Sequence, residues 1–451
     1  MRKTTGVIGA VVVIVIVAGA ALPWYAGKRI EQEFRHGVDE LSASAPLALT
    51  RYDRGWLSSE AITEVTIDTE DGPWQLDIHH HITHGPRLFG WARIDSTPDF
   101  GEAQASVAHY FGDQPALQAV TTVGFGNEIT SDWHSPAFDD AEFREAPGAR
   151  IAWGGLEGHY RLDGNHTETR LSLPALNIHG NGVALEVNNL KLESEGPGGA
   201  DWPATEPFWG GQFSTTLTRL NYQDEVNDIA LQMGLEGQGQ LRDNGDEGLA
   251  LASSWQLSNF KMDTASLSEP LIINNATQTL ALKRLPREET RQLLSRLSNL
   301  DSALDDAQLE RQVQQMMTQY IMAAIKGSPS LEVTMAGLDT PQGSMEGKLS
   351  IGFNDDSAAD RAARPSDLSR GKLTLDAAAD RTLLEKIVAR SDASVTPERM
   401  LQGLEQEGLL QRDGQRYRMD VHLDSRDLRI NGQSHPEFYM MLPLLLMSLG
   451  H

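Results

Sequence analysis

Regular alternation of apolar and polar residues is the feature of this sequence that most constrains its fold. Residues 76–82 and 249–257 are two clear examples, in which every second side chain falls on the same face of an extended segment. Turn-forming residues separate such segments, as at 162–165, 180–182 and 242–248, so successive strands are expected to return through antiparallel hairpins. The pattern predicts a mainly β fold with some α (α+β), built on a large antiparallel sheet with one covered face and one face open to water or ligand.

One long segment, residues 286–326, departs from this alternation and repeats its apolar residues every three or four positions. This spacing predicts two amphipathic helices with a break near residues 301–306. A shorter stretch with the same spacing, residues 30–41, predicts another helix that ends before Pro46. We expect the helical pair to pack on the sheet, because its polar face mixes both charges and is not basic. Together these elements form a strand-rich body over residues 30–353.

A smaller unit is expected at the C-terminus, over residues 370–451. The preceding segment, 354–369, is rich in Asp, Ala and Ser and is the best candidate for a linker. Residues 382–390 are expected to be helical, and Thr396-Pro397 is typical of the start of a second helix. A hairpin and short strands should follow, and the apolar run at 438–449 is too short to span a bilayer.

The N-terminus contains a segment without charge that runs from Thr4 to Gly27. As a helix, its 24 residues would extend about 36 Å, enough to cross a hydrocarbon core of about 30 Å. Four residues at its end are typical of a membrane interface, namely Trp24, Tyr25, Lys28 and Arg29. We therefore expect a transmembrane anchor over residues 1–29.

Two questions about this segment stay open at the level of sequence. The order of charged, apolar and small residues up to Ala18-Gly19-Ala20 also fits a cleavable signal peptide, although the residues that follow remain apolar. Basic residues flank both ends of the segment, so the charge rule does not fix its orientation.

Composition excludes several classes of function. The chain of 451 residues carries a formal net charge of −25, which disfavours nucleic acid as a partner because a polyanion would be repelled. It contains no cysteine, so disulfides, thiolate metal sites and cysteine nucleophiles are excluded. The length allows two or three domains without covalent cross-links.

Residues that could carry chemistry do not form a recognisable site. The run His79-His80-His81, with His84 close by, invites a metal interpretation, but on a strand these side chains alternate between two faces and no three converge. The sequence shows no nucleophile elbow, phosphate-binding loop, zinc helix or calcium loop. We therefore expect no metal, no cofactor and no catalytic residues, and the chain is not predicted to be an enzyme.

Several short motifs occur in order along the chain. They are "WYAGKRIE" at 24–31, "RYDRGWLSSE" at 51–60, "THGPRLFG" at 83–90, "IKGSPSLEV" at 325–333 and "RINGQ" at 429–433. With them the sequence resembles the YdgA-like family (DUF945) of Gram-negative bacteria. We interpret the motif residues as structural; they are Arg54, Gly55, Trp56, Ser58, Ser59, His84, Gly85, Pro86, Asn431 and Gly432.

The resemblance implies a single-pass inner-membrane protein with one N-terminal anchor and a large periplasmic body, and it supplies no reaction. Our first hypothesis is a non-enzymatic envelope protein whose half-apolar sheet binds or guides a lipid or another amphiphile. In the alternative, the apolar face is closed by residues 286–326, and the chain is a membrane-tethered scaffold that binds other envelope proteins. Architecture alone does not decide between them.

Overall fold

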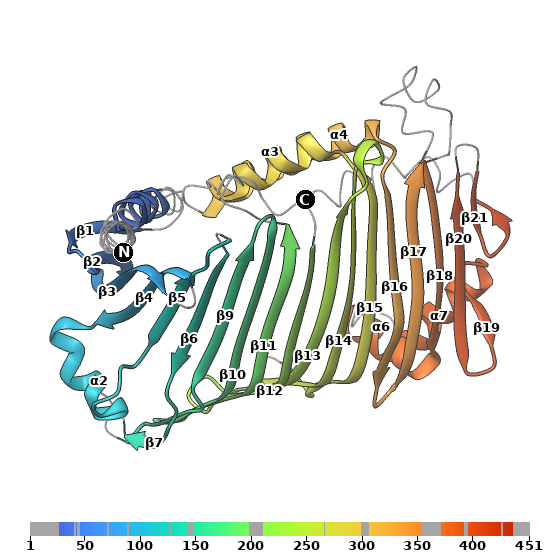
Figure 1. Ribbon diagram of the computed structural model, residues 1–451. Helices are drawn as coiled ribbons and strands as arrows, with labels where there is room; N and C mark the ends of the chain where they lie inside the picture. The colour runs from blue at the N-terminus through green and yellow to red at the C-terminus, as the bar shows by residue number, and fades with distance from the viewer. Residues whose placement is uncertain are drawn as a thin grey trace, which may run out of the picture. The chain divides into compact units, whose positions relative to one another are not determined.

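The computed structural model describes residues 27–39, 42, 46–69, 72–87, 90–126, 128–142, 148–197, 211–265, 267–298, 306–353, 371–391, 396–424 and 427–435. The chain divides into two compact units, residues 1–204 and 205–451, which we call unit 1 and unit 2. Each is built mainly of antiparallel strands, as the alternation predicts (Figure 1). The linker expected at 354–369 and the apolar run at 438–449 lie outside the described residues, so both stay predictions.

Unit 1 contains an antiparallel sheet in which β1 to β6 follow one another and β9, β10 and β11 continue from β6. The short strand β8 pairs with β10, and β7 pairs with β8. The strands are β1 (Leu47–Arg54), β2 (Ser58–Thr69), β3 (Gly72–Arg87), β4 (Gly90–Asp99), β5 (Gln118–Val123), β6 (Ile129–Ser135), β7 (Phe138–Glu142), β8 (Arg150–Trp153), β9 (Leu156–Asp163), β10 (His166–Gly180) and β11 (Val183–Pro197), and helix α2 (Gln104–Phe111) follows β4.

A helix over residues 27–39, here called the N-terminal helix, covers one face of the first strands of unit 1. Its Ile30 joins Ala61, Ile82 and Ala92 in a buried cluster, and Phe34 packs against this cluster. The predicted spacing of apolar residues is therefore confirmed, because the side chains that recur every four positions face the sheet. Ile82 is 0% exposed and marks the centre of this core.

Unit 2 contains a second antiparallel run in which β12 to β18 follow one another and β20 continues from β18. β19 pairs with β20, and the short strands β21 and β22 follow. The strands are β12 (Gly211–Asp224), β13 (Ile229–Asp243), β14 (Leu249–Thr264), β15 (Leu271–Leu285), β16 (Ser330–Thr340), β17 (Gly343–Phe353), β18 (Gly371–Asp380), β19 (Gln411–Asp413), β20 (Arg416–Leu423), β21 (Leu428–Ile430) and β22 (Gln433–Ser434).

The two helices expected within 286–326 are α3 (Arg287–Ser298) and α4 (Asp306–Lys326). They contact each other, and the Thr290 and Tyr320 hydroxyl oxygens lie 3.1 Å apart. Figure 1 shows them along one end of the strands, where Arg287 pairs with Asp243 at the end of β13. These contacts do not test the expectation that the pair packs on the sheet, which stays a prediction, because an amphipathic stripe shows that one side is buried but not against which element.

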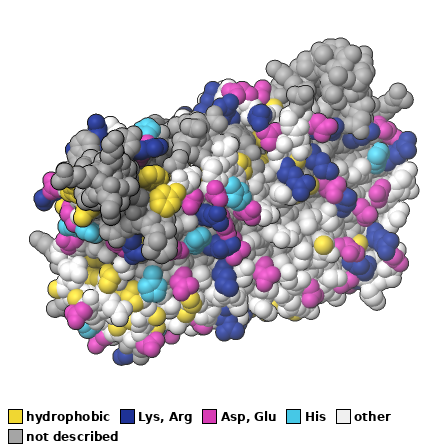
Figure 2. Space-filling view, in the orientation of Figure 1, with side chains coloured by type: hydrophobic (Ala, Val, Ile, Leu, Met, Phe, Trp, Pro, Cys, Tyr) yellow, Lys and Arg dark blue, Asp and Glu magenta, His cyan; other side chains and the backbone are white. Residues whose placement is uncertain are grey.

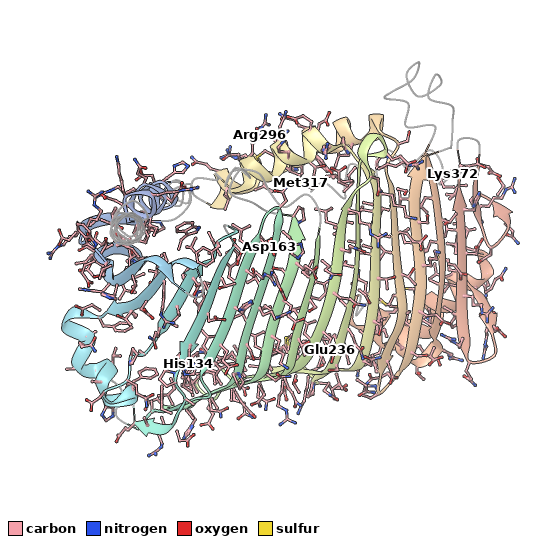
Figure 3. The ribbon with its side chains drawn as sticks, in the orientation of Figure 1. His134, Asp163, Glu236, Arg296, Met317 and Lys372 are labelled. Atoms are coloured by element: carbon pink, nitrogen blue, oxygen red, sulfur yellow. The ribbon has the colours of Figure 1, made fainter. Side chains whose placement is uncertain are left out.

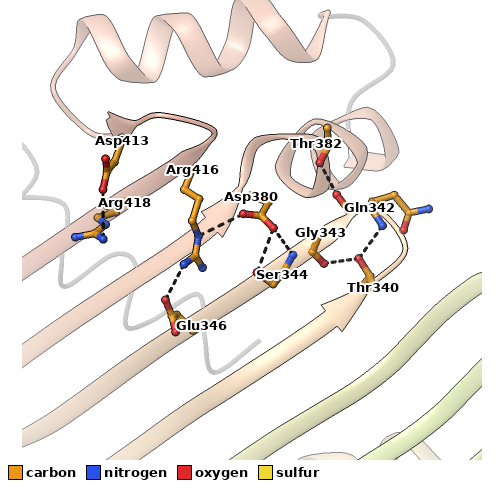
Figure 4. Close-up of polar contacts among 10 residues, drawn as sticks. All are labelled: Thr340, Gln342, Gly343, Ser344, Glu346, Asp380, Thr382, Asp413, Arg416 and Arg418. Carbon is orange, nitrogen blue, oxygen red and sulfur yellow. Dashed lines mark hydrogen bonds and ion pairs between the residues drawn. The ribbon is translucent and has the colours of Figure 1, made fainter.

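The helices at the C-terminal end of unit 2 are α6 (Arg381–Ser391) and α7 (Pro397–Gln406), in the ranges that the sequence predicts. Asp380, at the end of β18, accepts hydrogen bonds from the Ser344 backbone amide (2.7 Å) and hydroxyl (3.1 Å) and pairs with Arg416 at 3.3 Å (Figure 4). Arg416 also reaches Glu346 at 3.0 Å. This network joins the end of β18 to β17 and β20.

The membrane anchor expected at 1–29 falls almost wholly outside the described part of the chain, which begins at Gly27. Within the residues that are described, none of the helices combines the length and the hydrophobicity that a membrane span requires.

Candidate functional site

The strands of unit 2 are paired so that their apolar residues fall in continuous rows across the sheet. Each member is the direct partner of the next on the neighbouring strand. One row is Leu241, Leu251, Leu282, Leu331, Ile351 and Leu373. A second is Phe213, Gly239, Ser253, Leu280, Val333, Leu349 and Leu375. We call the face formed by these two rows the apolar face. The first row spans six strands, or about 24 Å at the usual spacing between strands, and the second continues onto a seventh.

The side chains of the apolar face are only partly buried. Leu251, Leu280 and Val333 are intermediate in exposure, and Ile351 is 37% exposed. Leu249, at the start of β14, is fully buried, and Gly237 and Gly239 are buried beneath aromatic rings. Contiguous apolar surface is unusual on soluble proteins, so this face is a candidate site of interaction.

The opposite face of the same strands is polar. Glu236, labelled in Figure 3, is exposed and pairs with Gln256, while Ser254 pairs with Thr279. Lys348 forms an ion pair with Glu332 at 3.0 Å. Figure 2 shows acidic and basic side chains scattered over unit 2 and few hydrophobic ones on the side in view. The sheet of unit 2 therefore has two chemically distinct faces, as a half-open sheet requires.

Two aromatic rings on the apolar face lie over glycines of the neighbouring strand. A Cβ atom at Gly237 would stand 2.3 Å from the Trp255 ring, and one at Gly239 would stand 2.4 Å from the Phe213 ring. The two rings are 6.3 Å apart between centroids. Glycine on the neighbouring strand therefore lets each ring cover backbone that would otherwise face solvent. The apolar face therefore contains two neighbouring aromatic rings among its leucines.

The face of unit 1 beneath the N-terminal helix differs, because it contains buried polar groups in pairs. Ser59 Oγ and His84 Nε2 lie 2.8 Å apart, and each residue is 2% exposed. A Cβ atom at Gly27 would stand 2.5 Å from His84 Nδ1, so the helix approaches the ring as closely as only glycine allows. Burial lowers the pKa of His84, and the charge of Arg54 acts in the same direction.

A second, part-buried group of polar side chains lies four residues further along the same strands. His80 contacts Thr63 Oγ1 through Nε2 and Ser96 Oγ through Nδ1, both at 2.8 Å. Burial lowers the pKa of His80 to about 4, with a contribution from the neighbouring His79. Both His80 and His84 are therefore neutral near pH 7 and act as hydrogen-bonding groups inside the core. We call these residues with Ser59, Thr63 and Ser96 the histidine seam.

In the histidine seam, Ser59 and His84 are as close as a catalytic nucleophile and its base, but they lack access to a substrate and a carboxylate partner. Ser59 and His84 are too deeply buried to meet a substrate, and none of the described residues places a carboxylate on the second nitrogen of His84. His79 and His81 point to the other face, near Asp99 and Glu60 respectively. Within the described ranges, three or more metal-binding side chains do not gather at any point.

The structure brings three of the motif stretches together around the N-terminal helix. Glu31 pairs with Arg54 at 3.0 Å, and the backbone amide of His84 donates to the Leu57 carbonyl at 2.8 Å. Gly55 closes the turn between β1 and β2 through its amide and the Ser58 carbonyl, at 2.9 Å.

The other predicted residues lie elsewhere. Trp56 is 57% exposed, and Gly85 is buried with a φ of 106°. Pro86 belongs to β3. Lys28 and Arg29 are exposed, whereas Trp24 and Tyr25 lie outside the described residues.

The motif at 429–433 lies in unit 2 and has a local structural role. Asn431 has a φ of 51°, and its amide nitrogen Nδ2 donates to the Gly408 carbonyl at 2.8 Å while its Oδ1 accepts from the Asp420 amide at 2.9 Å. Gly432 follows with a φ of 79°. These contacts fix the end of α7 against β20, so Asn431 and Gly432 form a turn and do not join the histidine seam.

Sequence reasoning missed a small apolar hollow in unit 1. It has a volume of about 290 Å³ and is lined mainly by aromatic side chains between α2, β7 and β8. The Phe111 and Phe138 ring centroids are 5.0 Å apart, and the Trp153 indole donates to Ser135 at 3.0 Å. The residues come from four elements, α2, β6, β7 and β8, whose packing is not encoded in any local motif. The space is at the lower limit for a small-molecule site.

The comparisons with known proteins identify a family and nothing more specific. A family model described as "Bacterial protein of unknown function (DUF945)" matches residues 1–437. No curated protein and no solved structure matches the chain. The match covers both units and all the motifs quoted above, so this chain is a member of the DUF945 family of bacterial proteins.

Proposed function

We propose that this chain is a non-enzymatic, single-pass inner-membrane protein whose periplasmic body binds a lipid or another amphiphile on the apolar face of unit 2. The observation that carries the proposal is the pair of apolar rows that cross six strands in register and stay partly exposed. Burial of apolar surface is the main favourable term in association, so a flexible acyl chain is a suitable ligand for such a surface.

The shape of the surface supports a chain-like ligand in preference to a compact one. Its first row extends across strands for about 24 Å, and the rings of Phe213 and Trp255 each cover a glycine on the neighbouring strand. Small-molecule sites are concave and bury most of their ligand. An open strip of leucines with two aromatic rings instead offers continuous contact along a hydrocarbon chain.

The location in the membrane is supported by the sequence before Gly27. Twenty-four residues without charge precede the first described turn, followed directly by exposed Lys28 and Arg29. This order is typical of a span with an interfacial collar. The inner membrane and a periplasmic body follow from the family resemblance. A tether of this kind would keep the apolar face close to a source of lipid.

The test compares two neighbouring residues on opposite faces of β14. Leu257 lies on the apolar side and pairs with Leu235, whereas Gln256 is exposed on the polar side. Full-length chain is extracted from membranes in polymer-bounded bilayer discs, delipidated by exchange into detergent, and mixed with phosphatidylglycerol before native mass spectrometry. Leu257→Glu should reduce lipid occupancy several-fold, and Gln256→Glu should leave it unchanged.

Two results would contradict the proposal. Equal occupancy in both variants and the natural sequence would show that bound lipid does not touch the apolar face. A chain that retains no lipid but crosslinks to one envelope protein through this face would favour the scaffold. Circular dichroism of each variant controls for loss of the fold.

A further inference from the structure

Three hairpin turns of unit 1 meet at one end of its sheet. Ser58 pairs with Thr83, Ala92 with Val123, and Val123 with Ile129. This register places the β1–β2, β3–β4 and β5–β6 turns at the same end of the strands, which we call the tip edge of unit 1. Strand spacing puts the first and last turns about 20 Å apart.

The exposed tips of these turns are hydrophobic. Trp56 is 57% exposed and Leu57 is 56% exposed in the first turn, and Phe125 is 52% exposed in the third. Phe125 packs edge-on against Trp91 at 5.4 Å between ring centroids, which holds it at the end of the sheet. Single exposed apolar side chains are common on protein surfaces, but these three lie at the same end of the strands of one sheet. We call Trp56, Leu57 and Phe125 the tip residues.

The described chain begins at this same end. Gly27 packs against the His84 ring, and the backbone amide of His84 donates to the Leu57 carbonyl at 2.8 Å. The end of the uncharged segment 4–27 is therefore separated from a tip residue by one buried histidine. Lys28 and Arg29 are exposed in the first turn of the N-terminal helix, beside this edge.

We infer that the tip residues dock into the headgroup region of the bilayer that holds the N-terminal segment, and so seat unit 1 directly on the membrane. The inference rests on the anchoring part of the proposed function. Tryptophan and phenylalanine side chains partition to the membrane interface, and lysine and arginine beside them bind anionic lipid. The occupant is a lipid surface because the uncharged segment ends within contact distance of the same edge.

The absence of cysteine from the chain allows a site-specific test in the full-length protein. Single-cysteine variants Leu57→Cys and Phe125→Cys carry an environment-sensitive fluorophore at the tips. Leu117→Cys is the matched control, because Leu117 is 38% exposed and precedes the opposite end of β5. Each is reconstituted into vesicles of equal parts phosphatidylcholine and phosphatidylglycerol that contain lipids spin-labelled near the headgroup. Quenching at the two tip positions should exceed quenching at Leu117 several-fold.

A fourth label separates failure of docking from failure of anchoring. Val13→Cys lies in the uncharged segment and should be quenched by lipids spin-labelled deep in the acyl chain. If Val13 is quenched but the tips behave like Leu117, the docking inference is wrong and the anchor stands. If Val13 is not quenched, anchoring itself fails. Trp56→Ser in the Leu57→Cys background should lower tip quenching, which excludes insertion driven by the dye alone.

Discussion

The strands of unit 1 beneath the N-terminal helix and the central strands of unit 2 share an architecture but differ in what covers them. In unit 1 the helix closes the face, Ile82 is fully buried, and Ser59 Oγ lies 2.8 Å from His84 Nε2. In unit 2 the corresponding rows carry Leu251, Leu280 and Val333, which remain partly exposed. The comparison shows that apolar rows are fully buried where the N-terminal helix covers them and stay partly exposed in the central strands of unit 2.

The comparison predicts the largest difference for truncation of one apolar residue on each face. Ile82→Ala should lower the free energy of unfolding of unit 1 by about 3 kcal/mol, because it removes fully buried carbons and leaves a cavity. Leu280→Ala should cost unit 2 about 1 kcal/mol, since part of that side chain already meets water. Hydrogen exchange at increasing denaturant, followed in peptides from β2–β4 and from β14–β16, measures each unit separately. Equal losses would mean that both faces are closed.

Acid should destabilise the covered face selectively. His80 has a pKa near 4 in the folded chain and 6.5 when unfolded, so above pH 6.5 both states are neutral and stability is unaffected. As the pH falls from 6.5 to 4, only the unfolded chain gains a proton, and unit 1 loses about 3 kcal/mol. His84 adds to this loss in the same direction.

The control for this pH effect uses histidines on opposite faces of β3. His80→Gln should remove most of the extra loss, whereas His81→Gln, at an exposed position, should leave it in place. Thermal denaturation of unit 1 between pH 7 and pH 4.5, read by hydrogen exchange in β2–β4, measures the difference. An unchanged profile in His80→Gln would show that carboxylates, and not the histidine seam, determine acid stability.

Removal of one polar partner should have an intermediate effect. Ser59→Ala leaves His84 Nε2 without its hydrogen bond in a buried position, and we expect a loss of about 1–2 kcal/mol in unit 1. Ser58→Ala, one residue away and half-buried, should change stability by less than about 0.5 kcal/mol. The same exchange measurement compares them, and similar values would argue that the seam contributes no net stability.

The smallest effect is expected at the ion pair that ties the N-terminal helix to β1. Arg54→Gln removes the contact with Glu31. The Arg54 side chain is 33% exposed and the Glu31 side chain is 21% exposed. Partial solvation limits its contribution to below about 1 kcal/mol. Protection of amides in residues 27–39 is the appropriate readout, since the helix should fray before the sheet responds. A loss as large as that in Ile82→Ala would show that the helix depends on this pair.

Much of the fold was predictable because it depends on local patterns. Alternation and turn residues predict the strands around Ile78 and Trp255, and helical spacing predicts α3, α4 and the N-terminal helix. The position of α3 and α4 was not predictable, because an amphipathic stripe does not identify the surface that it contacts.

The candidate site was less accessible to sequence reasoning. The alternation in β14 predicts that Leu251 and Leu257 share a face, and this is confirmed by their pairing. Their alignment with leucines on five other strands depends on register, which bulges such as that at Leu217 and Leu220 shift. The contact of Ser59 with His84 joins residues 25 positions apart, and no spacing rule would have paired them.

The central claim is that the apolar face of unit 2 contacts amphiphile, and adjacent serines on β14 test it most directly. Ser253 lies in an apolar row and Ser254 on the polar face, and both are half-buried. Ser253→Cys and Ser254→Cys change one atom each and carry the same environment-sensitive dye in the full-length chain. Phosphatidylglycerol is added while the detergent is below its critical micelle concentration. The fluorescence emission of the dye should then shift to the blue at position 253 and not at position 254. Equal shifts at both positions, or none at either, would contradict the account.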